Sequence, residues 1–338
     1  MSELTPPPPP FFIVGCPRSG TGLLRDLLRS HPNLAIPPES HFIPSYFKAF
    51  GNPSGPGAAR RLGRRILSVP HVALWGLDVP EDAFDGCACF SEIVEVVHRA
   101  WAEREGKPRW GDKTPQYVEH LRLLSDLFPR ARFVHLIRDG RDVTLSWLRT
   151  HFEPENTFTA ATFWARMVGA GREAGQSLGP DRYLEVRYED LVSNPEPELR
   201  RVLDHLGERF QPEVLKPSRL LPTWPIRDHL VRRPDSASRD RVVATSVARW
   251  RTAMSRKDRI LVESAAGAVL EELRYPVEGL ARSVGVPERV GWRIHHYVRY
   301  VYYRLRGRTL RRSFVLRGAA TLGGAALLVR ARSLANRL

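Results

Sequence analysis

The chain has little cysteine and lacks the apolar segments that are typical of export signals. Only three of its 338 residues are cysteines, Cys16, Cys87 and Cys89, which is too few for a disulfide framework. Cys87 and Cys89 form a lone C-x-C pair without a second pair at metal-ligand spacing, so ordinary thiols are favoured over zinc ligands. No charged segment followed by an apolar one opens the chain. These absences predict a reduced protein of the cytoplasm that holds no metal.

Acidic residues are almost absent from the end of the sequence. Residues 281–338 contain 13 arginines, no lysine and one acid, Glu288, a net charge of +12, whereas the other 280 residues carry 39 basic and 36 acidic groups, a net charge of +3. The uncharged stretch 318–329 has 12 residues, and a bilayer crossing needs roughly 20. The mixture of arginines and aromatics favours an anionic membrane surface at the inner face as the partner. A helical packing arm is the main alternative, and nucleic acid is disfavoured.

Composition divides the chain into a leader, a body and a tail. The segments are a proline-rich leader at 1–10, a body at 11–278 and a basic helical extension at 279–338. With 42% hydrophobic residues, the body is long enough to bury one large core. Residues 51–66 are rich in Gly, Pro and Arg, which predicts a mobile loop or a segment at the mouth of a site. The oligomeric state cannot be inferred from these patterns.

Apolar runs with strand character alternate with helical patterns in the body. The runs at 11–14 and 133–137 are each followed by a turn and a helical spacing of leucines, and "RYLEVRYEDLVSNPEPELRRVLDHLG" repeats this order. A helix is expected at 91–105, and helical apolar spacing also covers 109–129. Strands that alternate with helices predict an α/β fold with a parallel sheet covered on both faces.

The segment "FFIVGCPRSGTGLLRDLLRSHPNL", at 11–34, has the pattern of an anion-binding loop. A strand ends at Gly15, a turn rich in small residues follows, and a helix begins, so that backbone N–H groups and the helix dipole point at one spot. Gly15 and Gly20 fit the spacing of a Walker loop, but Thr21 and Gly22 follow where lysine is needed. A nucleotide kinase or hydrolase is therefore the weaker alternative.

A second anion-binding segment is "RFVHLIRDGRDVTLSW". Arg138 follows its strand, at the sheet edge where open α/β folds bind ligands, and Ser146 lies eight residues further on in the next helix. A guanidinium and a hydroxyl can converge on one phosphate. Together the two segments predict a site for a nucleotide with two separate phosphate groups.

These two segments resemble the 5′- and 3′-phosphate-binding motifs of the sulfotransferases that use 3′-phosphoadenosine 5′-phosphosulfate, among them bacterial members and the protein-tyrosine sulfotransferases. The resemblance covers about residues 11–278. It implies a P-loop-type fold with a five-stranded parallel sheet, and transfer of a sulfuryl group to a hydroxyl of a lipid, carbohydrate, small molecule or peptide. By this resemblance, the donor-binding residues are Arg18, Ser19, Gly20, Thr21 and Gly22 around the 5′-phosphosulfate, and Arg138 and Ser146 at the 3′-phosphate.

Two further segments match the family only through the resemblance. "LEVRYEDLVSNP" is similar to a family strand and turn in which Tyr188 lines the nucleotide site, although a purely structural strand end is an equal alternative. "ATSVARWRTAM" resembles the segment that closes over the nucleotide, with Ser246, Arg249 and Trp250 as contacts. Trp250 could stack on a base or pack in the core, and the adenine contacts stay open.

The reaction needs a base for the acceptor proton and cations for the developing charge. Glu39 in "AIPPESHFIP" matches the catalytic glutamate of the protein-tyrosine sulfotransferases, and His41 is the rival base. Lys113 in "GDKTP" matches the lysine near the sulfuryl group, beside Arg18. Acceptor specificity is expected in the loops at 42–90 and 151–160. A nucleotide-binding protein without enzymatic activity, recruited to a membrane by its tail, is the remaining alternative.

Overall fold

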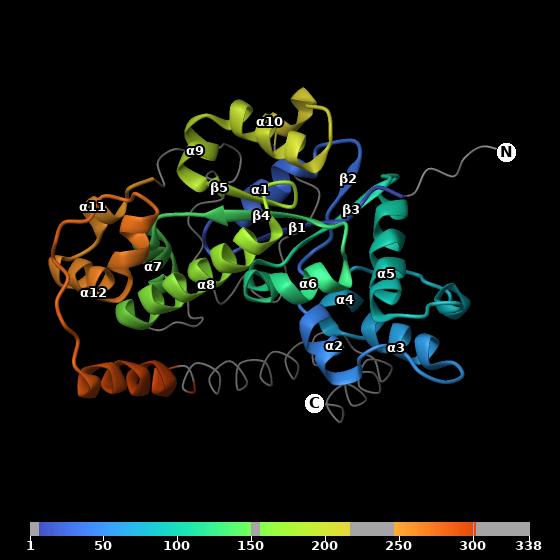
Figure 1. The fold of residues 1–338 in the computed structure, drawn as a ribbon, viewed down its shortest axis with the longest axis horizontal. Coiled ribbons are helices and arrows are strands. Elements are labelled where there is room, and N and C mark those ends of the chain that lie inside the picture. Colours follow the sequence, from blue (N-terminus) through green and yellow to red (C-terminus); the bar gives the residue numbers. More distant parts are fainter. Residues whose placement is uncertain (1–6, 150–155, 217–246, 300, 302–338) are drawn as a thin grey trace, which may run out of the picture.

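A five-stranded parallel sheet forms the centre of the chain (Figure 1). The computed structural model describes residues 7–149, 156–216, 247–299 and 301. The strands are β1 (Phe11–Gly15), β2 (Leu34–Ala35), β3 (Arg109–Lys113), β4 (Arg132–Ile137) and β5 (Tyr183–Arg187). Their order is β2-β3-β1-β4-β5, and every pairing is parallel. This architecture confirms the predicted α/β class with a parallel sheet flanked by helices.

Helices cover both faces of the sheet. The α-helices are α1 (Thr21–Leu28), α2 (Ile43–Phe50), α3 (Ala58–Leu67), α4 (Pro70–Ala73), α5 (Phe90–Arg104), α6 (Leu121–Leu127), α7 (Gly140–Leu148), α8 (Thr157–Leu178), α9 (Tyr188–Ser193), α10 (Pro195–Leu206), α11 (Trp250–Ala253) and α12 (Arg256–Glu272). Short 3₁₀ helices are η1 (Glu81–Phe84), η2 (Pro115–His120) and η3 (Pro212–Leu215). In Figure 1, α1, α9 and α10 lie on one side of the sheet and α6 and α8 on the other.

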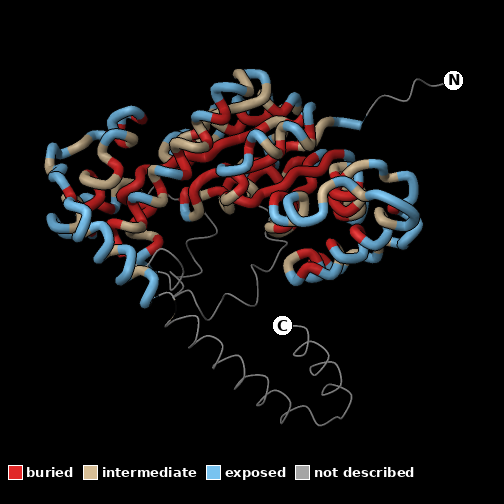
Figure 2. The backbone as a smooth tube through the Cα atoms, turned by 60° about the horizontal axis from the view of Figure 1, so that its bottom comes forward, coloured by how far each residue is buried: buried red, intermediate tan, exposed pale blue. Residues whose placement is uncertain are grey.

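Strand β1 shows why the sheet needs cover on both faces. Successive side chains of a strand point to opposite faces, so Phe11 and Ile13 pack into a core with α1 and α10. Phe12 and Val14 pack into the larger core with α5 and α8. All residues of β1 are buried, as expected for a central strand of a parallel sheet. In Figure 2 the buried strands lie in the middle of the molecule, with exposed segments around them.

Two expectations about local structure were wrong. Residues 51–66 were expected to form a loop, but Ala58–Leu67 is helix α3, in which Leu62 and Ile66 are buried. Two apolar residues spaced by one turn are enough to hold an otherwise arginine-rich helix on the core. Helical spacing was expected over 109–129, and η2 and α6 lie in this segment, but it begins with strand β3, where even the polar residues are buried.

The segment after helix α12 is held by hydrogen bonds between its backbone and a buried side chain, and not by strand pairing. The Glu263 carboxylate, 3% exposed, accepts hydrogen bonds from the N–H groups of Glu278 and Leu280, at 2.7 Å each. Val284 is buried, and a further helix spans 286–299. The tail beyond 301, the leader up to 6 and Ser246 lie outside the described residues.

Within the part of the chain that the structure describes, no helix combines the length and the apolar character needed to cross a membrane.

Candidate active site

The sheet order brings the predicted site residues to one edge. In a parallel sheet the carboxyl ends of all strands meet at the same edge. Each strand contributes one of these residues at or just after its end: Glu39 follows β2, Lys113 ends β3, Arg18 follows β1, Arg138 follows β4 and Tyr188 follows β5. The predicted residues, which span 171 positions of sequence, are therefore neighbours because of topology.

The loop after β1 has the geometry of an anion site. Helix α1 begins after Gly20, which has a φ of 97°, and no described side chain caps this helix end. The Ser19 hydroxyl is fully buried and has no hydrogen-bond partner among the described residues. A buried hydroxyl next to an uncapped helix terminus leaves polar groups that the oxygens of a phosphate or sulfate would satisfy. These residues thus fit the 5′ group of the expected donor.

Glycine is required at position 20 by a close contact. A Cβ atom on Gly20 would lie 2.3 Å from the ring of Tyr188, far below any normal contact distance. The guanidinium of Arg138 lies over the Tyr188 ring, 4.5 Å from the ring centroid. Tyr188 therefore joins the loop after β1 to the turn after β4. Both segments had been predicted to bind the same nucleotide.

Hydrogen bonds also connect the two anion-binding segments directly. Arg18 Nε donates to Ser146 Oγ at 3.0 Å, and Arg138 Nη1 donates to the Arg18 carbonyl at 3.3 Å. Arg18 itself has a positive φ of 76°, so its backbone is held in a conformation that residues other than glycine rarely adopt. The structure places the side chains expected at the 5′ and 3′ phosphates within one continuous set of contacts.

Asp142 is a buried acid that the sequence did not point to. Its Oδ2 lies 3.8 Å from Arg138 Nη2, and its Oδ1 accepts a hydrogen bond from the Trp250 N–H at 2.9 Å. Burial raises the pKa of Asp142 to about 6, although the charge of Arg138 opposes the rise. The spacing of Arg138 and Asp142 by one helical turn is the sequence signal that was available.

The segment around Trp250 lies next to the same turn. Trp250 is 2% exposed, and the guanidinium of Arg141 lies 3.6 Å from the centroid of its ring. Arg141 is itself paired with Asp139. These contacts match the core-packing alternative, because little of the ring surface is open to a base. Arg249 is exposed.

Glu39, His41 and Lys113 form a compact charged cluster. Lys113 Nζ donates to Glu39 Oε1, and His41 Nε2 lies 2.7 Å from Glu39 Oε2. Burial opposes ionisation of Glu39, but the charge of Lys113 and the hydrogen bond from His41 outweigh it and hold the pKa of Glu39 well below its usual range. Burial lowers the pKa of Lys113, against the attraction of Glu39. The carboxylate is therefore ionised at neutral pH.

A buried network of hydrogen bonds lies next to this cluster and supports it. The Thr114 hydroxyl accepts from the Ser40 N–H at 3.1 Å and donates to Asp112 Oδ1 at 2.7 Å. The other oxygen of Asp112 lies 3.1 Å from His98 Nε2. The Ser40 hydroxyl meets the Tyr117 hydroxyl at 2.7 Å. Because Ser40 lies between Glu39 and His41, these bonds fix the backbone that carries both candidate bases.

Sequence reasoning missed this network. Asp112 and Thr114 flank Lys113 in "GDKTP", and three polar residues at the end of a buried strand were a usable signal. His98 comes from α5 and gave no local signal. Among the described residues there is no group of three or more His, Cys, Asp or Glu side chains that could hold a metal ion. Cys16, Cys87 and Cys89 are free thiols.

Comparison with known proteins assigns the chain to a family. A model described as the sulfotransferase family matches residues 9–212, so the chain belongs to that family. It is similar to protein-tyrosine sulfotransferase A of Caenorhabditis elegans, with 27% identity over 218 residues, which is 63% of this chain and 53% of that protein. It is also similar to nodulation protein NoeE of Sinorhizobium fredii, with 26% identity over 310 residues, 85% of this chain and 71% of that protein.

Solved structures support the same fold. The sulfotransferase domain from the curacin biosynthetic pathway superposes with a TM-score of 0.60 at 23% identity, covering 80% of this chain and 99% of that domain. The sulfotransferase domain of the Synechococcus PCC 7002 olefin synthase gives a TM-score of 0.54 at 23% identity, covering 82% and 98%. This chain spans only 53% and 40% of the C. elegans and Drosophila melanogaster protein-tyrosine sulfotransferases, about half of their length.

Proposed function

We propose that this protein transfers a sulfuryl group from 3′-phosphoadenosine 5′-phosphosulfate to a hydroxyl acceptor. The convergence of two contacts at one sheet edge carries the proposal. The Arg18 to Ser146 hydrogen bond, 3.0 Å long, joins the loop after β1 to helix α7, and the Lys113 and Glu39 pair lies at the same sheet edge. Sites for two separate anions and a cation paired with a base are what sulfuryl transfer from this donor requires.

The anion-binding residues have distinct roles in this proposal. The N–H groups of 19–22 and the Ser19 hydroxyl hold the 5′ group, and Arg138 with Ser146 holds the 3′-phosphate. Lys113 and Arg18 stabilise negative charge near the group that is transferred. When bound, the donor supplies an activated sulfuryl group with a phosphate as its leaving group. We further propose Tyr188 and Arg249 as nucleotide contacts, with the buried Trp250 supporting the segment that carries Arg249. Ser246 is proposed as a contact from the sequence pattern alone.

Glu39 is the proposed base, and His41 is the alternative. Glu39 is ionised because its pKa lies below the usual range, so it can accept a proton at neutral pH, but a low pKa also makes it a weak base. His41 Nε2 at 2.7 Å from the Glu39 carboxylate could share the proton. In both arrangements the proton leaves the acceptor hydroxyl as its oxygen attacks sulfur in line with the departing phosphate.

A thermal-shift comparison tests the nucleotide class. We expect 3′-phosphoadenosine 5′-phosphate to raise the melting temperature without magnesium, because the donor has no β- and γ-phosphate pair for a metal to bridge. A kinase or hydrolase would instead respond to ATP with magnesium, and that result would contradict the proposal. Stabilisation by the nucleotide without any sulfated product would indicate a nucleotide-binding protein that is not an enzyme.

The acceptor is the least defined part of the proposal. The related proteins carry names that refer to protein tyrosine, to nodulation and to ω-hydroxy-β-dihydromenaquinone-9, so the family name does not select one hydroxyl compound. We propose that residues 42–90, which form α2 to α4 and η1, contribute to acceptor choice. Incubation of a cell extract with radiolabelled donor, followed by separation of labelled products, would identify the acceptor.

A further inference from the structure

The helix at 286–299 carries most of the exposed large apolar side chains of the described chain. Eight large hydrophobic side chains are exposed among the described residues, and five of them lie on this helix. They are Val286, Val290, Ile294, Tyr297 and Val298, with exposed fractions between 46% and 71%. At about 100° per residue these positions fall within one sector of roughly 120°. They form a continuous outer stripe rather than scattered apolar residues.

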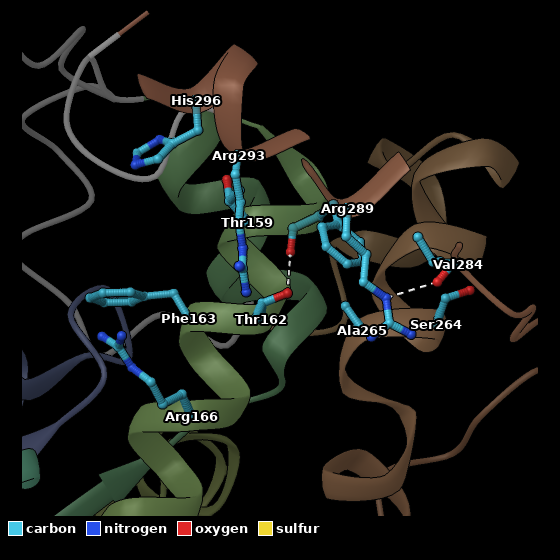
Figure 3. Close-up of a pocket in the computed structure, with 11 residues that line it drawn as sticks. Thr159, Thr162, Phe163, Arg166, Ser264, Ala265, Val284, Arg289, Arg293 and His296 are labelled. Atoms are coloured by element: carbon cyan, nitrogen blue, oxygen red, sulfur yellow. Dashed lines mark hydrogen bonds between the residues drawn. The ribbon is translucent and has the colours of Figure 1, made fainter. Parts of the chain in front are cut away.

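The inner side of the same helix is held on the body. Asn156 Nδ2 donates to the Trp292 carbonyl at 3.0 Å, which ties the helix to the body. Arg289 Nε donates at 2.8 Å to the carbonyl of Val284, in the segment just before the helix. Arg289, Arg293 and His296 line a cavity of about 500 Å³ between this helix, α8 and α12 (Figure 3). Because these contacts fix the rotation of the helix, the outer stripe faces away from the protein.

The net charge around the outer stripe indicates which kind of binding partner fits it. The only acid of residues 281–338 is Glu288, which is paired with Arg282, and the net charge of this segment is +12. Two copies that met through the stripe would bring two such segments together and repel each other. Nucleic acid would neutralise the arginines but leave the apolar side chains in water. An anionic lipid surface satisfies both features.

We propose that helix 286–299 docks the protein on an anionic lipid bilayer through the outer stripe. The apolar side chains enter the boundary between headgroups and acyl chains, and the arginines lie among the headgroups. Docking in this way holds the body at the bilayer surface. The proposal rests on the outer stripe and on the net charge of residues 281–338, and it does not depend on the proposed sulfuryl transfer.

Vesicle flotation of the full chain tests the proposal. We expect the protein to float with vesicles that contain about one third phosphatidylglycerol and not with pure phosphatidylcholine, and binding should weaken in about 1 M salt, where the Debye length falls to about 3 Å. The variant Ile294→Glu/Tyr297→Glu should lower the partition coefficient at least about tenfold. The variant Ile294→Leu/Tyr297→Phe, which keeps the stripe apolar, should bind like the wild type.

A matched control separates the stripe from net charge. Gln176→Glu/Ser177→Glu adds the same two negative charges at exposed positions of α8, roughly 30 Å along this helix from Asn156 at about 1.5 Å per residue. We expect near wild-type binding. Equal losses in both charged variants, or no flotation of the wild type, would overturn the proposal. The proposal would also be overturned if the wild type did not bind vesicles and instead formed a concentration-dependent dimer that Ile294→Glu/Tyr297→Glu abolishes, as measured by light scattering.

Discussion

The two halves of the candidate site are held in place in different ways. Around the anion-binding loop, the groups meet through single hydrogen bonds and ring contacts, such as Arg18 to Ser146 and Arg138 over Tyr188. Around Glu39, a chain of buried hydrogen bonds runs through Thr114 and Asp112. The first half can exchange protein contacts for ligand contacts, whereas the second is organised before any ligand binds.

This difference has a physical reason. A nucleotide brings its own charges, so the arginines that receive it need freedom to turn toward phosphate oxygens. A base must keep its position relative to the acceptor within a fraction of an ångström. Buried networks with every group satisfied give that rigidity, because breaking any bond leaves an unpaired polar group. Changes in the first half should therefore alter affinity, and changes in the second should alter turnover.

The largest effect is expected from Glu39→Gln. Glutamine keeps the shape but cannot take the acceptor proton, so turnover should fall roughly a hundredfold or more while nucleotide affinity stays near the wild-type value. Single-turnover kinetics and calorimetric titration with 3′-phosphoadenosine 5′-phosphate measure the two quantities. If turnover survives in Glu39→Gln and collapses in His41→Ala, the base is His41.

Asp142→Asn should change how stability depends on pH. The folded carboxyl has a pKa of about 6 against an ordinary 3.8, so raising the pH from 4 to above 6 ionises it at a cost to the folded state of up to about 3 kcal/mol. Asparagine removes that cost. The variant should match the wild type at pH 4 and be more stable at pH 8, by urea unfolding. A constant difference between the variant and the wild type at every pH would refute the assignment.

Arg138→Ala tests the anion-binding half. Loss of a charge-assisted hydrogen bond should weaken 3′-phosphoadenosine 5′-phosphate binding by about 1.5 to 3 kcal/mol, and Ser146→Ala should weaken it by about 0.5 to 1.5 kcal/mol. Calorimetric titration measures both. An unchanged dissociation constant in folded Arg138→Ala would remove this residue from the site.

A smaller effect than that of Arg138→Ala is expected from Thr114→Val in the buried network. Valine has the same shape but leaves Asp112 Oδ1 and the Ser40 N–H without this partner, which should lower the free energy of unfolding by about 1 to 2 kcal/mol and turnover with it. Nucleotide affinity should not change. Thr162→Val serves as the control, because among the described residues its hydroxyl bonds within α8, to the Phe158 carbonyl. A loss of nucleotide affinity in Thr114→Val would show that the two halves are not independent.

Some parts of the site could be predicted because their signals are local. Gly15, Gly20 and Arg138 stand next to apolar strands, and a strand, a turn and a helix are recognisable from neighbours in sequence. The helix α3 was missed because Leu62 and Ile66 are its few buried apolar residues among arginines. The pairing of His98 with Asp112 could not be predicted, because helix α5 and strand β3 meet only when the core forms.

The sequence by itself determined most of the strand and helix units, the glycines of the anion loop and the separation of a nearly neutral body from a tail with a charge of +12. These properties depend on composition and on neighbours along the chain. The tertiary structure decided the rest: that Lys113 and His41 both reach Glu39, that Asp142 is buried, and that no other described segment covers the outer stripe of 286–299. Hydrogen bonds and pKa values depend on which distant segments meet, and in this protein the strand order of the sheet makes that choice.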